Sequence, residues 1–295
     1  MDRLRVSVRH YFREGALDWF DRSYLTDWAL VLLIWFSTGL VAVLPIFERT
    51  FLRSDQDIKY PHKKNQVSSY TNQAIALFLP LSVFIAVGCL KRSLLVIHHG
   101  ALGLCASRGL AMFITEVLKH SVGRLRPDFL ARCKWDKALD KCTGQKQAIL
   151  DGRKSFPSGH SSTAFSGMFF LSLWIAGQTA AWAFDVPRTA RSLRSSRLLA
   201  FGITLLPIFW ASHVAMTRLQ DYRHHKEDVI VGSLLGCLCA TISYLMFWPN
   251  PCSSSSFNYQ VFGQPRLSYI EAEYATTRAD DFELGRLEAD EENAV

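Results

Sequence analysis

Three short clusters in this sequence carry side chains that can act on a phosphate group. They hold two histidines, an aspartate, three cations and a glycine turn, namely Lys119, Arg126, Ser158, Gly159, His160, Arg218, His224 and Asp228. A histidine can attack phosphorus or carry a proton, and an arginine fork matches the paired oxygens of a phosphate. Each cluster lies at the end of an apolar stretch, so the pattern indicates phosphate chemistry at a membrane surface.

The third cluster provides a candidate nucleophile. His224 and Asp228 are four residues apart, so on a helix they share one face and can form a hydrogen bond. An aspartate that holds one ring nitrogen fixes the tautomer and leaves the other nitrogen free to attack. His225 is three residues from Asp228 and is a rival that the spacing does not exclude.

The second cluster provides a candidate proton donor and an anion-binding turn. His160 follows Ser158 and Gly159 at the start of an apolar run, where the unpaired amides of a helix start can bind an anion. A protonated His160 could give its proton to a leaving oxygen. Pro-Ser-Gly is also ordinary turn material, so a capping turn with a solvated histidine is the alternative.

The three cations complete the candidate phosphate site. Lys119 and Arg126 are seven residues apart, which is two helical turns, and Pro127 favours a helix end there. Arg218 adds a third cation from another apolar run. Any one of them could instead be a long side chain that anchors a helix end at the interface. The convergence of all three near two histidines favours a phosphate site.

The apolar stretches predict six membrane spans, each able to cover about 30 Å as a helix, the thickness of a hydrocarbon core. The runs are Ala29 to Phe47, Ala74 to Leu90, Leu94 to Leu118, Ser161 to Phe184, Leu198 to Met216 and Val229 to Trp248. With six crossings, the end of span three, the start of span four and the end of span five lie on one side of the membrane. We therefore predict an all-α integral membrane bundle that brings the three clusters together.

Two polar residues lie inside the predicted spans but outside the clusters. Arg108 is near the middle of the third span, where an unpaired charge costs about 3 kcal/mol on insertion scales. We predict that it faces the bundle and finds a partner or water there. His213, in the fifth span, is predicted to be a hydrogen-bonded core residue rather than a member of the site.

The distribution of cations gives the expected orientation. Lys91 and Arg92, together with the arginines between positions 188 and 197, favour a cytosolic side for the termini. The loop from His120 to Lys154 is also rich in cations, but a site that attracts phosphate needs them whatever the topology. We expect cytosolic termini and a site on the lumenal, vacuolar or extracellular face.

The composition suggests three segments along the chain. Residues 1–24 form a cytosolic or interfacial segment in which no signal peptide is evident, residues 25–248 form the six-span domain, and residues 249–295 form a disordered acidic tail. The net charge of +7 would suit nucleic acid in a soluble chain. Here the basic residues lie in loops between spans, so the expected partners are membrane phospholipids and the bilayer, not nucleic acid.

Two of the seven cysteines share a hydrophilic loop. Cys133 and Cys142 are nine residues apart, a separation that permits a disulfide if the loop faces an oxidising compartment. Free thiols are the alternative.

The three clusters resemble the signature of the type 2 phosphatidic acid phosphatase superfamily. That signature runs lysine, six residues, Arg-Pro; then Pro-Ser-Gly-His; then Ser-Arg, five residues, histidine, three residues and aspartate. The matching residues are Lys119, Arg126, Pro127, Pro157 to His160, Arg218, His224 and Asp228. Thr217 stands in place of the serine and keeps its hydroxyl group. The resemblance covers roughly Leu25 to Trp248, and the surrounding runs look like the branch of lipid phosphate phosphatases and diacylglycerol pyrophosphate phosphatases.

The resemblance implies a six-helix fold of the phosphatase and haloperoxidase kind, and a hydrolase that needs neither metal nor cofactor. His224 would then form a phosphohistidine, Asp228 would orient it, and His160 would protonate the leaving alcohol. The phosphate would be bound by Lys119, Arg126, Ser158, Gly159 and Arg218. The expected substrates are phosphatidate, diacylglycerol pyrophosphate and lysophosphatidate. Polyisoprenyl pyrophosphates and sphingoid-base phosphates are alternatives within the family, and a six-span transporter is an alternative from another class.

Overall fold

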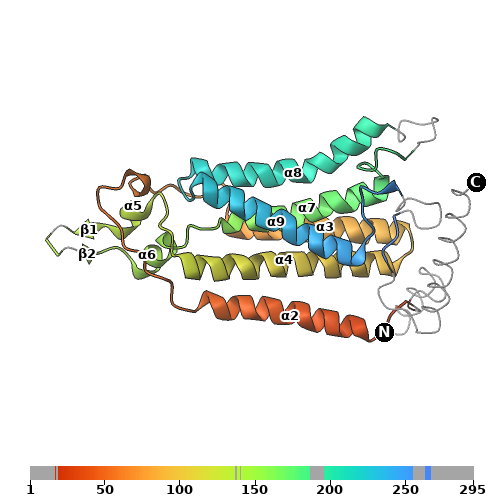
Figure 1. The fold of residues 1–295 in the computed structure, drawn as a ribbon, viewed down its shortest axis with the longest axis horizontal. Coiled ribbons are helices and arrows are strands. Elements are labelled where there is room, and N and C mark those ends of the chain that lie inside the picture. Colours follow the sequence, from red (N-terminus) through yellow and green to blue (C-terminus); the bar gives the residue numbers. More distant parts are fainter. Residues whose placement is uncertain are drawn as a thin grey trace, which may run out of the picture.

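The computed structural model describes residues 17, 19–136, 138–139, 141–186, 196–254 and 263–266, and most of them are helical (Figure 1). The long helices are α2 (Ser23–Ala42), α3 (Ser69–Leu90), α4 (Leu94–Val122), α7 (Gly159–Thr179), α8 (Arg197–Gln220) and α9 (Lys226–Phe247). The short elements are η1 (Gln56–Ile58), α5 (Phe129–Cys133), β1 (Trp135–Asp136), β2 (Lys141–Cys142) and α6 (Lys146–Gly152). The predictions for the N-terminal segment and the acidic tail fall mostly outside the described residues.

The long helices form one bundle with α7 at its centre. α7 contacts α3, α4, α8 and α9, and α2 packs on the outer side of α4 (Figure 1). The largest apolar core lies between these helices and includes Phe84, Phe170, Trp174 and Tyr244. The predicted all-α class is therefore confirmed.

Among the described residues, five helices are long and apolar enough to cross a membrane: α2, α3, α4, α8 and α9. The protein is thus a multi-pass integral membrane protein. α7 is not among the five, because its sequence is rich in serine, threonine and glycine. Most of its residues are buried against other helices, so it presents little surface to lipid, and small residues suit such close packing. The sixth span, which α7 would provide, stays a prediction.

Serine caps set the start of four long helices. The hydroxyl oxygens of Ser68, Ser93, Ser158 and Ser196 each accept a hydrogen bond from the backbone N–H three residues further on. α4 ends at Gly123, whose φ of 58° lies in the left-handed region. A Cβ atom at Gly123 would lie 1.9 Å from the Phe47 carbonyl oxygen, so glycine is required there.

The end of α4, the start of α7 and the end of α8 lie at one end of the bundle, beside the starts of α3 and α9 (Figure 1). The same end carries α5, α6 and the small antiparallel hairpin of β1 and β2, in which Trp135 pairs with Cys142. Cys133 and Cys142 form a disulfide that closes this hairpin. The three sequence clusters are therefore located at one end of the molecule.

One prediction about the spans is wrong and another is confirmed. His213 is exposed on α8 rather than buried in the core, and its ring centroid lies 5.8 Å from that of Trp210. It shares its face of the helix with the exposed Phe209 and Met216, which point away from α7. Arg108, in contrast, is 1% exposed and hydrogen-bonds inside the bundle, as predicted.

Candidate active site

His224 lies in the turn between α8 and α9 and is held by a backbone carbonyl. Its Nδ1 is 2.7 Å from the Ser155 carbonyl oxygen, which can only accept, so Nδ1 carries the proton. Asp228 Oδ2 is 3.8 Å from the same nitrogen. The expected direct hydrogen bond to Asp228 is therefore not formed, and Nε2 is left without a partner among the described residues.

Asp228 is fully buried and its two oxygens are occupied by other donors. Oδ1 accepts from the Arg124 guanidinium at 2.7 Å. Oδ2 accepts from the Ser155 hydroxyl at 2.6 Å and from the His225 backbone N–H at 3.0 Å. Ser155 thus links the two predicted partners, because its hydroxyl binds Asp228 while its carbonyl binds His224.

The surroundings of His224 keep its ring neutral at ordinary pH. Burial lowers the pKa of His224 to about 4, and the charges of Arg126 and Lys119 lower it too, against the opposing effect of Asp228. A neutral ring with its proton on Nδ1 has a free lone pair on Nε2. That is the form in which a histidine can act as a nucleophile.

His160 lies in the first turn of α7, next to α3. Its Nε2 is 3.4 Å from the Ser69 hydroxyl, and its carbonyl oxygen accepts from the Asn72 side chain at 2.9 Å. The Ser158 N–H, one residue before α7, donates to the Asp228 carbonyl at 2.9 Å. This bond joins the start of α7 to the start of α9, and so fixes His160 relative to His224.

Each of the three predicted cations is paired with a carboxylate, and the pairs of Lys119 and Arg126 border the same space. Lys119 Nζ lies 2.6 Å from Glu116 Oε1, and the Arg126 guanidinium lies 2.8 Å from Asp151 Oδ1. Burial would raise the pKa of Asp151, but the charges of Arg126 and Arg132 lower it to about 2. Arg126 Nε is buried without a hydrogen-bond partner among the described residues. The cations keep unused donor capacity for an anion.

A cavity of about 260 Å³, here called the inner cavity, brings five of the predicted residues together. It is lined by Lys119, Arg126, Gly159, His160 and His224, with further residues from α3, α4 and α7. A Cβ atom at position 159 would lie 2.8 Å from Lys119 Nζ, so the glycine allows the lysine to approach the start of α7. The inner cavity thus combines two histidines with two cations.

The other three predicted residues support the inner cavity without lining it. Ser158 and Asp228 hold the starts of α7 and α9, as described above. Arg218 is 1% exposed, and its guanidinium donates to Asp221 Oδ2 at 3.1 Å and to Thr217 Oγ1 at 2.9 Å. Thr217, which replaces the serine of the signature, therefore provides the hydroxyl oxygen that binds the arginine.

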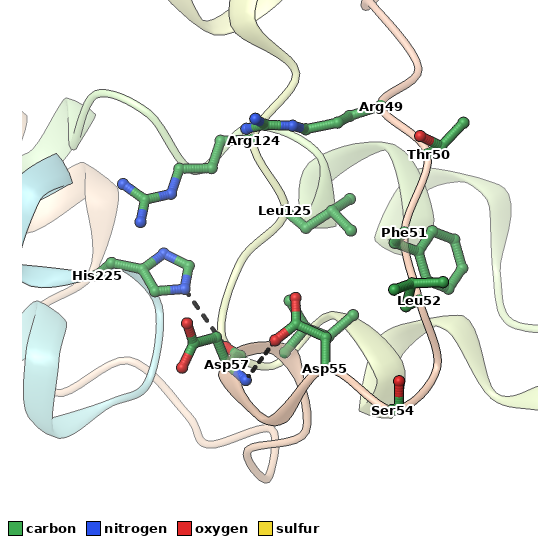
Figure 2. A pocket seen from close by; sticks show the side chains of 11 residues that line it. Arg49, Thr50, Phe51, Leu52, Ser54, Asp55, Asp57, Arg124, Leu125 and His225 are labelled. Carbon is green, nitrogen blue, oxygen red and sulfur yellow. Dashed lines mark hydrogen bonds between the residues drawn. The ribbon is translucent and has the colours of Figure 1, made fainter.

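His225 lines a different cavity, here called the outer cavity (Figure 2). The outer cavity measures about 560 Å³ and lies between the segment 49–58 and the side chains of Arg124, Leu125 and His225. His225 Nε2 lies 3.4 Å from the Asp57 carbonyl oxygen, and its Nδ1 lies 3.3 Å from Asp228 Oδ2. Of the two neighbouring histidines, only His224 lines the cavity that contains Lys119 and Arg126.

Several site residues were not predicted from the sequence. Glu116 is three residues before Lys119, and this helical spacing could have revealed the pair. Ser155 is close to the Pro-Ser-Gly-His turn, but its role depends on the path of the backbone. Asp151 belongs to α6 and has no regular spacing from any cluster. Among the described residues, no group of three or more His, Cys, Asp or Glu side chains could hold a metal ion.

Comparison with known families agrees with this arrangement. Residues 100–252 match the PAP2 superfamily, and this range contains all the residues of the three clusters. The chain belongs to the PAP2 superfamily.

The similar proteins share most of their length with this chain. Lipid phosphate phosphatase 2 of Arabidopsis thaliana is 34% identical over 240 residues, which cover 78% of this chain and 79% of that protein. Probable diacylglycerol pyrophosphate phosphatase 1 of Schizosaccharomyces pombe is 33% identical, covering 76% and 81%. Diacylglycerol pyrophosphate phosphatase 1 of Saccharomyces cerevisiae is 32% identical, covering 69% and 72%. No solved structure matches the chain.

Proposed function

We propose that this protein is a membrane phosphohydrolase that removes the terminal phosphate from phosphatidate, diacylglycerol pyrophosphate or lysophosphatidate. The observation that carries the proposal is the inner cavity, where the neutral ring of His224 lies with His160, Lys119 and Arg126. The names of the similar proteins support glycerolipid phosphates as substrates. They favour this function over polyisoprenyl or sphingoid phosphate hydrolysis and over transport.

The proposed reaction has two steps, each a displacement at phosphorus. In the first step, His224 Nε2 attacks phosphorus and the bond to the leaving oxygen breaks, while His160, which must enter this step as the imidazolium, gives that oxygen a proton and becomes neutral. In the second step, water attacks the phosphohistidine, His160 takes a proton from the water, and phosphate leaves. Lys119, Arg126 and the free amides at the start of α7 stabilise the negative charge on the phosphate oxygens.

Three further residues have supporting roles in this proposal. Arg218 adds positive charge close to the inner cavity. Asp228 acts on His224 mainly through Ser155, whose hydroxyl and carbonyl contact the two residues at 2.6 Å and 2.7 Å. Ser155 is therefore a positioning residue for the nucleophile. When the reaction places positive charge on the His224 ring, the nearby Asp228 carboxylate stabilises it.

The orientation in the membrane is also part of the proposal. Residues 25–248 form the catalytic domain with six spans, α7 included, flanked by the segments 1–24 and 249–295. The disulfide between Cys133 and Cys142 lies at the active-site end, and such bonds persist in oxidising compartments. This supports cytosolic termini and a site on the lumenal, vacuolar or extracellular face, where a lipid phosphate at the bilayer surface can enter the inner cavity.

The proposal is tested by measuring phosphate release from phosphatidate and diacylglycerol pyrophosphate in detergent micelles that contain EDTA. The wild type is compared with His224→Ala and with the neighbouring His225→Ala as a matched control. We expect release that does not require metal, that is lost in His224→Ala and that is largely kept in His225→Ala. Near-normal release from a folded His224→Ala variant would contradict the proposal.

A further inference from the structure

The inner cavity extends deeper into the bundle than a phosphate group requires. Along α4 its lining runs from Lys119 through Glu116 to Met112, a distance of about 10 Å along the helix axis. The phosphate-binding and reacting groups are all at the outer end of this path. The inner end is thus available to the part of a substrate that follows the phosphate.

Two residues of α3 mark successive levels in the inner cavity. Ser69 contacts His160 and so lies at the level of the leaving oxygen. Gln73 is four residues further along α3, which places it about 6 Å deeper in the bundle. In a diacylglycerol phosphate, the carbonyl oxygen of the middle ester is only a few bonds from the leaving oxygen, so the two oxygens can lie at neighbouring levels of such a path. Gln73 is therefore at the level of that ester.

Arg108 holds Gln73 with its amide nitrogen available. The Arg108 guanidinium donates to Gln73 Oε1 and, at 2.8 Å, to the Thr163 carbonyl oxygen. It also lies 4.0 Å from Met112 Sδ, so it contacts three residues that line the inner end of the cavity. Because Oε1 is occupied, the amide group of Gln73 has its N–H donors left, and they have no partner among the described residues.

A buried cation, Arg108, lies behind the inner end of the cavity, whereas the Glu116 carboxylate that lines the cavity is paired with Lys119. Arg108 is 1% exposed, and its Nε is buried without a partner among the described residues. A buried arginine favours ligand groups that accept hydrogen bonds and disfavours cationic groups. Ester carbonyls are acceptors, whereas a sphingoid base carries an ammonium group near this level and an isoprenoid chain has no polar atom there.

We propose that the inner end of this cavity is a subsite for the ester region of a glycerolipid, in which the Gln73 amide nitrogen donates to an ester carbonyl oxygen and Arg108 positions Gln73. This inference rests on the proposed function and names the structural class of its substrate. It gives a function to a buried arginine inside the bundle that the phosphate chemistry itself does not use.

The test compares two synthetic substrates that differ only in the ester carbonyls: diacyl phosphatidate and its dialkyl ether analogue. The quantity measured is the ratio of their kcat/KM values in wild type, Gln73→Leu and Gln73→Glu. Gln73→Glu keeps an oxygen for Arg108 but loses the N–H donors, so it remains informative if Gln73→Leu does not fold. The matched control is Gln178→Leu. In the wild type, Gln178 contacts Lys91 at the opposite end of the bundle.

We expect the wild type to prefer the diacyl substrate, and the ratio to fall about three- to tenfold in both Gln73 variants, as expected for one lost hydrogen bond. Gln178→Leu is expected to keep the wild-type ratio. An unchanged ratio in a folded Gln73 variant would overturn the proposed subsite, even if the kcat/KM values for the diacyl and dialkyl substrates both fall. Wild type that releases phosphate from neither substrate, nor from the pyrophosphate lipid, would instead remove the proposed function and this inference with it.

Discussion

Both ends of the helical bundle contain a pair of histidines, but their surroundings differ. At one end, His160 and His224 line a cavity with Lys119 and Arg126. At the other end, His98 and His99 are packed among aromatic side chains: Trp28 Nε1 donates to His98 at 3.0 Å, and the Tyr24 hydroxyl lies 3.1 Å from His99. We therefore expect reactivity only from the pair that lines a cavity beside cations, and a packing role for the pair enclosed by aromatic rings.

The largest difference between the two ends is expected on removal of one histidine. His160→Ala removes the proposed proton donor and is expected to lower kcat by about 10²- to 10⁴-fold. His99→Ala removes a packing residue and is expected to keep most of the activity while lowering the unfolding temperature by about 2–4 °C. Phosphate release and thermal unfolding in micelles measure the two effects. Equal losses of activity in both variants would contradict the distinction.

The cations are expected to show the next largest difference. Arg126→Ala removes a charge next to the transferred phosphate and is expected to lower kcat/KM by about 100-fold. Arg126→Lys is expected to recover only part of this, because it lacks the planar fork. The matched control is Arg197→Ala at the opposite end, where the arginine binds the Phe184 and Val186 carbonyls. If Arg126→Ala behaved like Arg197→Ala, Arg126 would be a structural residue.

A smaller effect is expected at Ser155. Ser155→Ala breaks the link to Asp228 but keeps the carbonyl that binds His224, so kcat should fall about tenfold with little change in KM. Ser155→Thr keeps a hydroxyl and should restore much of the rate. Ser107→Ala, which removes a buried hydroxyl bonded to the Ser166 carbonyl, is the control. A rise in KM at unchanged kcat would indicate that Ser155 binds substrate and does not position His224.

The smallest expected effect is a shift in the pKa of the His224 ring. In wild type the His224 ring is expected to gain its proton only near pH 4, because burial and nearby cations lower its pKa. Arg126→Ala removes one of these cations, so the pKa should rise towards that of an ordinary histidine, and the ring is then protonated at higher pH. Histidine NMR in micelles can follow both titrations. A wild-type midpoint near 6.5 would contradict a buried, neutral His224.

The sequence predicted which residues come together better than it predicted their contacts. Lys119, Arg126, Gly159, His160 and His224 meet in one cavity because helix ends at one side of a bundle converge, and this follows from counting spans. The bond between His224 and the Ser155 carbonyl depends on the path of the backbone before Pro157, which no residue type encodes. The pairing of Arg126 with Asp151 depends on how α6 folds back, and loop geometry of this kind has no periodic signal.

For the membrane spans too, the sequence predicted their existence better than their exact ends and buried faces. The helix ends near the clusters differ from the predicted ends of the apolar runs. α4 ends at Val122, with Gly123 as its cap, so Arg126 lies beyond the helix and not two helical turns along it from Lys119, as the spacing and Pro127 had suggested. His213 was predicted to be a hydrogen-bonded core residue, yet α8 lies at the edge of the bundle and turns that face outward. Which face of a span is buried depends on its neighbours, and α8 is apolar over much of its surface.

The central claim is that His224 becomes covalently bound to phosphate during turnover. The most direct measurement is to mix the enzyme with phosphatidate labelled with radioactive phosphorus, quench within the first turnover, and locate the label by peptide mapping. The account predicts a label that is stable to base, labile to acid and attached to His224, and that is absent from His224→Ala. A label on His225, or phosphate release by wild type with no labelled protein at any time, would contradict it.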